Sequence, residues 1–298
     1  MERKLVLIID FNNVLYSHYF TKPLSNSKGQ NIQAIKGFMF RLKSLRETFN
    51  PDYIVICRDM SRARTFRREL YPEYKATRKP INEDILFQSK ETIRLLSLMG
   101  YPILGNDRYE ADDLMGMIAR LSNDLGMDAL IVSADKDLYQ LVNDHTTIWS
   151  FRKEEIIDKD YILKNYGLRP DQWIDLKILQ GDRSDNIPGI EGIGPKTAEQ
   201  LMRGFGSIQD IFENMEKLSK SIQVKLRMGK GVIQITRKLV TIVTDYKILD
   251  ITDKNLLRTM MFPEEVFQTI GELEIPSLTG IIKYDLLPIE KREVQEEC

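Results

Sequence analysis

Three short apolar runs constrain the fold of this chain more than any other feature. They are rich in branched residues and read "KLVLIID" (4–10), "DYIVICRD" (52–59) and "MDALIVSAD" (127–135). Runs of this length between polar segments are typical of buried parallel strands. Segments with helical periodicity lie between and after them, at about 31–49, 83–99 and 111–125. The alternation predicts an α/β fold class, with a central parallel sheet wrapped by helices.

Each of the three runs ends in an aspartate. These are Asp10, Asp59 and Asp135, and Asp137 follows two residues after the last of them. One such residue is commonplace, because Asp favours turns and helix caps, but three at equivalent strand ends are unusual. Ligands of such sheets bind in the crevice beyond the carboxyl ends of the strands. We therefore expect a functional site at this edge.

The segment "YEADDLMG" (109–116) adds three more carboxylates within four positions, Glu110, Asp112 and Asp113. An apolar run with helical periodicity follows, so Asp112 and Asp113 would lie in a first helical turn. The helix dipole stabilises an anion there by about 0.3–1 kcal/mol. Capping does not account for Glu110 as well. The crowding suggests that these carboxylates face a cation.

Nine carboxylates are candidates for one acidic site once the segment after residue 180 is included. They are Asp10, Asp59, Glu110, Asp112, Asp113, Asp135, Asp137, Asp182 and Asp185. Without counter-charge they would raise one another's pKa values and destabilise the fold. Two Mg²⁺ ions about 3.5–4 Å apart are a recurrent solution in phosphodiester hydrolysis. We expect Mg²⁺ here, with Mn²⁺ able to substitute, since oxygen ligands suit both ions.

Cysteine and histidine usage argues against other kinds of site. The chain has two cysteines, far apart in sequence, and two histidines. Two cysteines and two histidines are too few for a disulfide framework or for a zinc centre with thiolate or imidazole ligands.

The apolar stretch "LVLII" is too short to span a bilayer or to form a signal-peptide core, so we expect a cytoplasmic protein that does not contact a membrane.

Basic residues are concentrated in two stretches, although the formal net charge is only −1. Residues 58–79 carry eight basic residues against three acids, with Tyr71 and Tyr74 between them. The second stretch comprises Lys217, Lys220, Lys225, Arg227 and Lys230. A charge run is ordinarily a solvated helix face, but this density with interleaved aromatics favours phosphate contact. Without the nine acids the rest of the chain carries +8, which favours a nucleic-acid partner.

The composition of the sequence changes near 170–180, where glycine becomes frequent and the alternation of predicted strands and helices stops. We predict an α/β core at 1–175 and a mostly helical region at 176–298. The segment "GIEGIGPKT" (189–197) is not a P-loop, because Pro195 stands where that motif needs glycine. It predicts a glycine-rich hairpin and a helix that starts near Pro195. The hairpin could present backbone N–H groups to a phosphate or form an ordinary helix–loop–helix connection.

The segment "IIDFNN" (8–13) argues against a haloacid-dehalogenase phosphatase. Such an enzyme needs a second Asp two residues after the first, and this chain has Asn12 there.

Five motifs in order resemble the 5′ nuclease (flap endonuclease) superfamily. They are "LIIDFNNVLY", "TFRRELYPEYKATR", "YEADDLMG", "SADKDLYQLV" and "LQGDRSDNIPGIEGIGPKTA". The likeness covers most of the chain. It is greatest to the 5′→3′ exonuclease domain of bacterial DNA polymerase I and its stand-alone bacterial and phage relatives, which implies a PIN-like nuclease core followed by a helical helix–hairpin–helix region.

The resemblance also implies roles for individual residues. Asp10, Asp59, Glu110 and Asp112 look like a first metal cluster with Asp113 close by, and Asp135, Asp137, Asp182 and Asp185 look like a second. A basic arch or clamp near 60–95 would carry Lys75 and Arg78 as steering residues for the scissile phosphate, with Tyr74 stacked on a base and Arg67 in contact with DNA. The helix–hairpin–helix near 186–212 would grip duplex DNA through Gly192, Gly194, Lys196 and Thr197, with K⁺ bound there in some relatives. Two departures are Ser17, where polymerase-associated domains have arginine and His18 is a candidate substitute, and an Asp59-to-Phe66 interval one residue longer.

These expectations describe a structure-specific 5′→3′ exonuclease and flap endonuclease. It would hydrolyse DNA near single-strand/duplex junctions by two-metal-ion catalysis, as a monomer acting on DNA with 5′ flaps or ends. RNA–DNA hybrids are a further candidate substrate. Two alternatives stay open: RNase H-like removal of RNA primers, and a non-catalytic structure-specific DNA-binding protein. A polymerase or a single-strand-binding protein as partner is not readable from the sequence.

Overall fold

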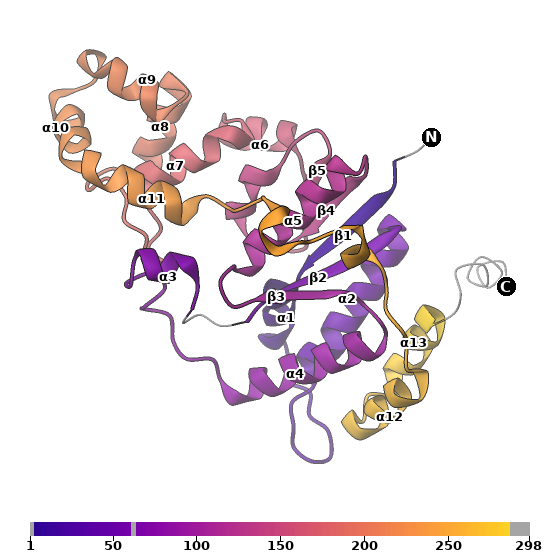
Figure 1. Cartoon of the computed structure of the whole chain (residues 1–298). Coiled ribbons are helices and arrows are strands. Elements are labelled where there is room, and N and C mark those ends of the chain that lie inside the picture. The colour runs from indigo at the N-terminus through magenta and orange to yellow at the C-terminus, as the bar shows by residue number, and fades with distance from the viewer. Residues whose placement is uncertain (1–2, 61–63, 287–298) are drawn as a thin grey trace.

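A computed structural model of the chain describes residues 3–60 and 64–286. Its centre is a six-stranded sheet with the strand order β3-β2-β1-β4-β5-β6 (Figure 1). The first five strands in this order are mutually parallel, and β6 runs antiparallel to β5. The prediction of a central parallel sheet is confirmed for these five strands, and β6 adds an antiparallel strand at one edge, which makes the whole sheet mixed. Arg62 of the basic stretch lies outside the described residues.

The three predicted strands occupy the middle of the sheet. They are β1 (Leu5–Asp10), β2 (Tyr53–Asp59) and β4 (Asp128–Val132), and β1 pairs with both of the others. The strands that the sequence did not predict lie outside them: β3 (Ile103–Asn106), β5 (Thr146–Ser150) and β6 (Glu155–Ile157). They are short, and none of them is a continuous buried apolar run. The central strands were predictable because both of their faces are covered.

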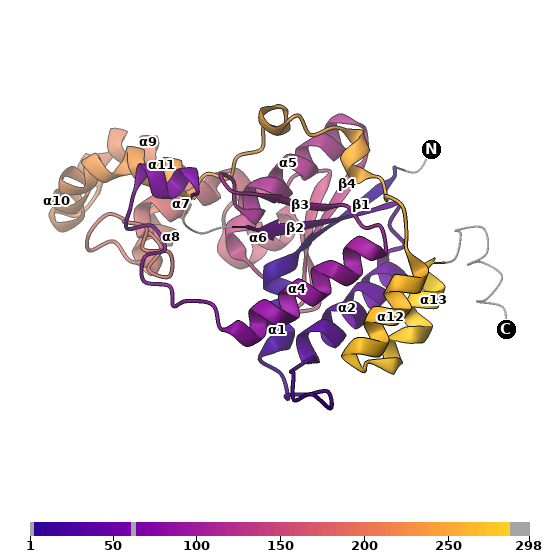
Figure 2. The ribbon, with the colours of Figure 1, turned by 60° about the horizontal axis from the view of Figure 1, so that its bottom comes forward.

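Alternate residues of the strands face two different helical layers. Val6 and Ile8 of β1 pack in a core with α5 (Ala111–Asp124). Leu7 and Ile9 pack on the other side, against α1 (Phe11–Tyr19), α2 (Gln33–Phe49) and α4 (Glu83–Leu98). Figure 2 shows α2 and α4 on one side of the sheet and α5 on the other. The helices predicted at 31–49, 83–99 and 111–125 are confirmed within two residues at each end.

The C-terminal region is helical, as predicted, and the described residues beyond 157 form no further strand of the sheet. Its helices are α6 (Lys159–Tyr166), α7 (Trp173–Gln180), α8 (Pro195–Phe205), α9 (Ile208–Glu213), α10 (Lys220–Gly229), α11 (Ile233–Val240), α12 (Pro263–Leu273) and α13 (Thr279–Leu286). In Figure 1 α8, α9 and α10 extend away from the sheet, whereas α12 and α13 lie beside α4 on the opposite side of the molecule. In residues 3–60 and 64–286 no helix is both long and apolar enough to cross a membrane.

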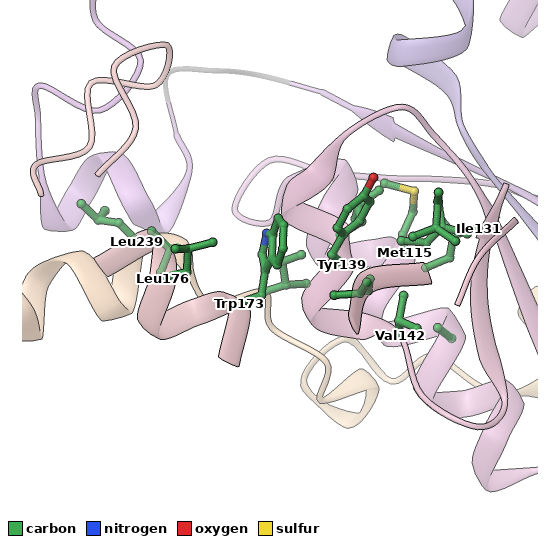
Figure 3. Close-up of a cluster of buried hydrophobic side chains, with 14 of the residues drawn as sticks. Met115, Ile131, Tyr139, Val142, Trp173, Leu176 and Leu239 are labelled. Carbon is green, nitrogen blue, oxygen red and sulfur yellow. The ribbon is translucent and has the colours of Figure 1, made fainter. Parts of the chain in front are cut away.

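One apolar core connects the sheet to the helical region. Figure 3 follows it from Ile131 and Met115, through Tyr139 and Trp173, towards Leu239. Tyr139 and Trp173 lie with their ring centroids 4.9 Å apart. This shared core fixes α7, and the loop that follows it, relative to the carboxyl edge of the sheet. The division into 1–175 and 176–298 stays a prediction.

Candidate active site

The carboxyl edge of the sheet gathers five of the predicted acids from four structural elements. Asp10 and Asp59 are the last residues of β1 and β2. Asp135 caps the 3₁₀ helix η1 (Lys136–Leu141), three residues after β4 ends. Glu110 is the N-cap of α5, and Asp112 lies in the first turn of that helix, as predicted. The elements therefore bring these residues together, as their positions after apolar strands indicated.

Hydrogen bonds from the first turns of α1 and α5 and from Ser133 orient the carboxylates of β1 and β2. Asp10 Oδ1 accepts the Asn13 N–H at 3.0 Å, and Oδ2 accepts the Ser133 hydroxyl at 2.7 Å. Asp59 Oδ1 accepts the Ala111 N–H at 2.9 Å. Ser133, which is completely buried, also accepts the Asp135 N–H at 3.1 Å. Ser133 thus links two of the acids, a role that the sequence gave no signal for beyond its position at the end of a strand.

The acids divide into two sets by their partners. In the part of the chain that the structure describes, no basic side chain forms an ion pair with Asp10, Asp59, Asp112 or Asp135. We call these four the unpaired quartet. The other five, Glu110, Asp113, Asp137, Asp182 and Asp185, each pair with Arg67, Lys75, Arg78 or Lys177. We call these the paired set.

Burial and electrostatic crowding raise the pKa of two members of the unpaired quartet, Asp10 and Asp112. Burial raises the pKa of Asp10 to about 7, although two hydrogen bonds oppose the rise, and the nearby Asp59 and Asp135 carboxylates add to it. Burial likewise raises the pKa of Asp112 well above its usual range, with Asp135 and Asp10 adding to the effect. Carboxylates that disfavour their own charge in this way are the kind of site that a divalent cation stabilises.

The donor set of the quartet fits a hard cation such as Mg²⁺ or Mn²⁺, because all of its ligand atoms would be carboxylate oxygens. Among the described residues, no group of three or more acidic, histidine or cysteine side chains is yet spaced as the ligands of one ion. Binding of an ion would therefore require side-chain movements that draw the quartet together. Without the ion, mutual repulsion keeps these carboxylates apart, and a bound cation would offset that repulsion.

Asp113 is not placed as a metal ligand, contrary to the sequence prediction. It is completely buried, and Arg67 donates to both of its oxygens, at 2.6 and 2.7 Å. The backbone N–H groups of Glu110 and Val243 complete its hydrogen bonds, at 3.1 and 2.9 Å. A carboxylate whose oxygens are used in this way is a structural counter-ion.

Arg67 is likewise not placed to contact DNA, because it is only 3% exposed. Its other donors reach the Leu239 and Thr241 carbonyls, at 2.8 and 3.0 Å. The side chain thereby joins α3 (Phe66–Leu70), α5 and the end of α11. A sequence cannot show which arginine of a basic run turns inward, since these contacts are 46 to 174 residues away.

Tyr74 also points inward, so the prediction that it stacks on a base does not hold in this structure. Its side chain is buried, and its hydroxyl donates to Glu110 Oε2 at 2.7 Å. Lys75 Nζ donates to Glu110 Oε1 at 2.6 Å and lies 3.6 Å from Asp185 Oδ2. Although burial opposes it, Lys75 and Arg67 hold the pKa of Glu110 below its usual range.

Lys75 and Arg78 do lie at the acidic edge, where the resemblance suggested steering residues. Arg78 pairs with Asp185, and the Lys75 N–H donates to the Asp185 carbonyl at 2.8 Å. Lys75 has a left-handed backbone with φ +54°, a conformation that is strained for a non-glycine residue. The segment is held against the acids by these contacts.

Lys177 is a functional candidate that the sequence analysis missed. It lies on α7, and its Nζ is 2.6 Å from Asp137 Oδ1 and 2.7 Å from Asp182 Oδ2. Burial raises the pKa of Asp137 to about 6 although Lys177 opposes the rise. Burial acts in the same direction on Asp182, but hydrogen bonds from Lys177 and Ser184 lower its pKa to about 2. A lysine inside the apolar run "WIDLKIL" was the available signal.

The predicted hairpin and helix start are present next to Lys177. Gly192 has φ +76°, which favours glycine, and Gly194 is the N-cap of α8 with Pro195 at its first position. Lys196 is exposed and Thr197 half-buried at the start of that helix. Lys225 Nζ donates to the Gly192 carbonyl at 3.0 Å, so a fixed ammonium group already lies at the hairpin where the resemblance suggested K⁺. The hairpin, Lys177 and Asp182 line one cavity of about 790 Å³.

Neither Ser17 nor His18 replaces the arginine of polymerase-associated domains. The Ser17 hydroxyl donates to the Val14 carbonyl at 2.7 Å. The His18 ring packs against Gly37, where any side chain would clash with it. Its Nε2 is buried without a hydrogen-bond partner among the described residues, and burial together with Arg41 lowers the pKa of His18. With Nε2 buried, this imidazole is not placed to contact a phosphate.

Two protein-family models match consecutive segments that together span residues 5–261. Residues 5–167 match the 5′-3′ exonuclease, N-terminal resolvase-like domain, and residues 168–261 match the 5′-3′ exonuclease, C-terminal SAM fold. The chain belongs to the 5′–3′ exonuclease family. The resemblance suggested by the five motifs is thereby confirmed, and so is the expected fold of a nuclease core with a helical C-terminal region.

Curated members of the 5′–3′ exonuclease family include both short and long proteins. A 5′-3′ exonuclease of Aquifex aeolicus is 34% identical over 92% of this chain and 94% of its own length. The thermostable DNA polymerase I of Thermus thermophilus is 37% identical over 80% of this chain, which corresponds to 29% of that polymerase. The chain thus spans about a third or less of the DNA polymerase I relatives that it matches.

Solved structures show the same fold at low sequence identity. The 5′-exonuclease of bacteriophage T5, solved with zinc ions, superposes with a TM-score of 0.69 at 22% identity, covering 91% of this chain and 99% of that one. The catalytic core of Rad2, solved in complex with a DNA substrate, has a TM-score of 0.60 at 18% identity, covering 96% and 93%.

Proposed function

We propose that this 5′–3′ exonuclease is a structure-specific, divalent-metal-dependent nuclease that cuts DNA near junctions of single strand and duplex. The observation that carries the proposal is the unpaired quartet at the ligand-binding edge of the sheet. Its four carboxylates are buried or half-buried and form no ion pair with a basic side chain in residues 3–60 and 64–286. Its metal-bound and DNA-bound structural neighbours support the same chemistry. We propose Mg²⁺ as the natural ion and Mn²⁺ as a substitute.

The residues of the chain would divide the work of such a reaction. Asp10, Asp59, Asp112 and Asp135 would hold the metal ions, which when bound lower the pKa of a water and stabilise the leaving oxygen. Lys75 pairs with Glu110 and Arg78 with Asp185, both of the paired set at the same edge, and the two cations would supply positive charge for the phosphate at the site of cutting. The exposed Lys196 and the N-terminus of α8 present a cation and backbone N–H groups to a duplex further away.

Product mapping on a labelled 5′-flap substrate tests the proposed function. In Mg²⁺ the protein should release 5′ fragments that end in a 3′-OH, leave a 5′-phosphate on the duplex, and cut close to the junction. EDTA should abolish the reaction. Binding of the flap without any product in Mg²⁺ or Mn²⁺ would instead identify a non-catalytic DNA-binding protein.

Lys75→Ala and Arg78→Ala test the assignment of steering residues. If these side chains orient the scissile phosphate, turnover should fall by about 10²-fold with duplex affinity nearly unchanged. The exposed Lys164→Ala on α6 is the matched control. An equal loss of turnover and affinity would make Lys75 and Arg78 ordinary phosphate contacts.

Three accompanying properties stay predictions. We propose that the protein acts as a monomer in the cytoplasm, and that its substrates are DNA ends and flaps in replication or repair. Matched all-DNA and RNA–DNA flaps at the same ionic strength would show whether RNA primers are also cut, because affinity depends steeply on salt. Assignment of a polymerase or single-strand-binding partner needs a binding experiment.

A further inference from the structure

Lys177 contacts the acidic edge of the sheet from α7, a helix of the C-terminal region. We infer that Lys177 is a positioning residue that acts as the permanent cation of Asp137 and Asp182, so that the DNA-free protein has no preformed metal site at these two carboxylates. The inference rests on the proposed function and concerns how the second acidic group is neutralised. The resemblance had placed both acids in a second metal cluster.

The geometry of Lys177 is that of a bridging cation. Its ammonium lies 2.6 Å from Asp137 Oδ1 and 2.7 Å from Asp182 Oδ2, distances typical of charge-assisted hydrogen bonds. The residue is 9% exposed, so its charge needs both partners. A divalent ion between the same two carboxylates would compete for the same oxygens and would leave a buried, unpaired ammonium.

Lys177 cannot move away easily, because the elements on both sides of it are fixed. Its neighbours Leu176 and Ile178 on α7 are buried in the core. Gly181, which ends the helix, has φ +67°, and a Cβ there would lie 2.5 Å from the Gly189 nitrogen. Asp182 follows in this tight loop, and its Oδ1 is held by the Ser184 N–H at 2.8 Å.

The bridge also connects to the unpaired quartet. The Asp137 N–H donates to Asp135 Oδ1 at 2.9 Å, and the Asp135 N–H donates to Ser133. Ser133 in turn donates to Asp10. Lys177 therefore positions η1, and through η1 the Asp135 carboxylate, without contacting the quartet itself.

Lys75 provides the contrast within the same site. It also lies between two acids, Glu110 and Asp185, but it is carried by a short turn with a strained backbone rather than by a packed helix. The contact of Lys75 with its acids is therefore the easier one to break. Lys177 is the fixed cation of the pair.

Counting bound Mn²⁺ in the DNA-free protein tests the inference without using activity. Free Mn²⁺ is measured by electron paramagnetic resonance for the wild type, Lys177→Met and the exposed control Lys164→Met. We expect Lys177→Met to bind at least one Mn²⁺ more than the wild type, because two neighbouring carboxylates lose their cation. Lys164→Met should match the wild type. Equal Mn²⁺ binding by folded Lys177→Met and wild type would overturn the inference.

Two further variants keep the test decisive if Lys177→Met does not fold. Lys177→Arg preserves the charge and should retain the Mn²⁺ count of the wild type. Asp182→Asn should also retain it, since this carboxylate holds no ion in the DNA-free protein, and loss of Mn²⁺ from Asp182→Asn would contradict the inference. The two proposals fail separately. If the wild type does not cut a flap but the variants bind Mn²⁺ in the numbers expected above, the proposed function is overturned and the inference on Lys177 stands.

Discussion

The unpaired quartet and the paired set lie at the same edge of one sheet but are stabilised in different ways. The acids of the paired set have arginine or lysine partners that the fold itself supplies, such as Arg67 for Asp113. The quartet has no such partner in the described chain, and the pKa of Asp10 and of Asp112 is raised instead. Carboxylates with a built-in cation hold the structure together, and those without one are available to a metal ion.

The largest expected effect is on catalysis, from a change in the quartet. Asp112→Asn should lower the rate of flap cleavage at saturating enzyme by about 10³-fold or more, because a metal ligand is lost. The same change removes a repelling charge, so the melting temperature of the metal-free protein should stay the same or rise. Quenched-flow cleavage and thermal denaturation in EDTA measure the two effects. A variant that cuts at nearly the wild-type rate would remove Asp112 from the site.

A change in the paired set should act on stability instead. Asp113→Asn leaves the buried Arg67 with one carboxylate partner fewer, and breaking a buried ion pair costs about 3–5 kcal/mol. Urea denaturation should show this loss of unfolding free energy. Asp124→Asn, at the exposed end of the same helix, is the control and should change stability little. The division of the acids would be wrong if Asp113→Asn were as stable as the wild type but had lost Mn²⁺.

The raised pKa of Asp10 predicts how pH acts on the metal-free protein. Its folded pKa of about 7 lies above the ordinary aspartate value of 3.8, so the folded state binds the proton more tightly than the unfolded state. This contribution to stability is present at low pH and is lost as the pH rises through about 4 to 7. Melting temperatures in EDTA should therefore fall over this window, and Asp10→Asn should flatten the fall. The same slope in both proteins would show that Asp10 is not the cause.

The smallest expected effect concerns the hairpin region. Lys196→Ala should weaken duplex binding uniformly across sequences and reduce the slope of log K against log salt by about 1. Fluorescence anisotropy with a labelled duplex at several salt concentrations measures it. An unchanged slope would mean that Lys196 does not contact a phosphate.

Local sequence patterns correctly predicted the strands and the helix that carry Asp10, Asp59 and Asp112. Asp10 and Asp59 could be placed because they end apolar runs, and Asp112 because it opens an amphipathic helix. β3 was missed because its four residues are not buried. The glycine-proline sequence at 194–195 gave the start of α8 correctly.

The pairing of the acids could not be predicted, because it depends on contacts between distant segments. Arg67 and Tyr74 looked like surface residues of a basic stretch, yet both point into the core. Their partners lie 36 to 174 residues further along the chain. Lys177 belongs to no motif that the sequence analysis used, and its pairing with Asp137 exists only because α7 packs beside η1.

Mn²⁺ binding to the DNA-free double variant Asp10→Asn/Asp112→Asn tests the central claim most directly. If the unpaired quartet is the metal centre, the folded double variant should lose the Mn²⁺ that the wild type binds, whereas Asp137→Asn/Asp182→Asn should keep it. Retention of that Mn²⁺ by Asp10→Asn/Asp112→Asn, or its loss only from Asp137→Asn/Asp182→Asn, would contradict the account.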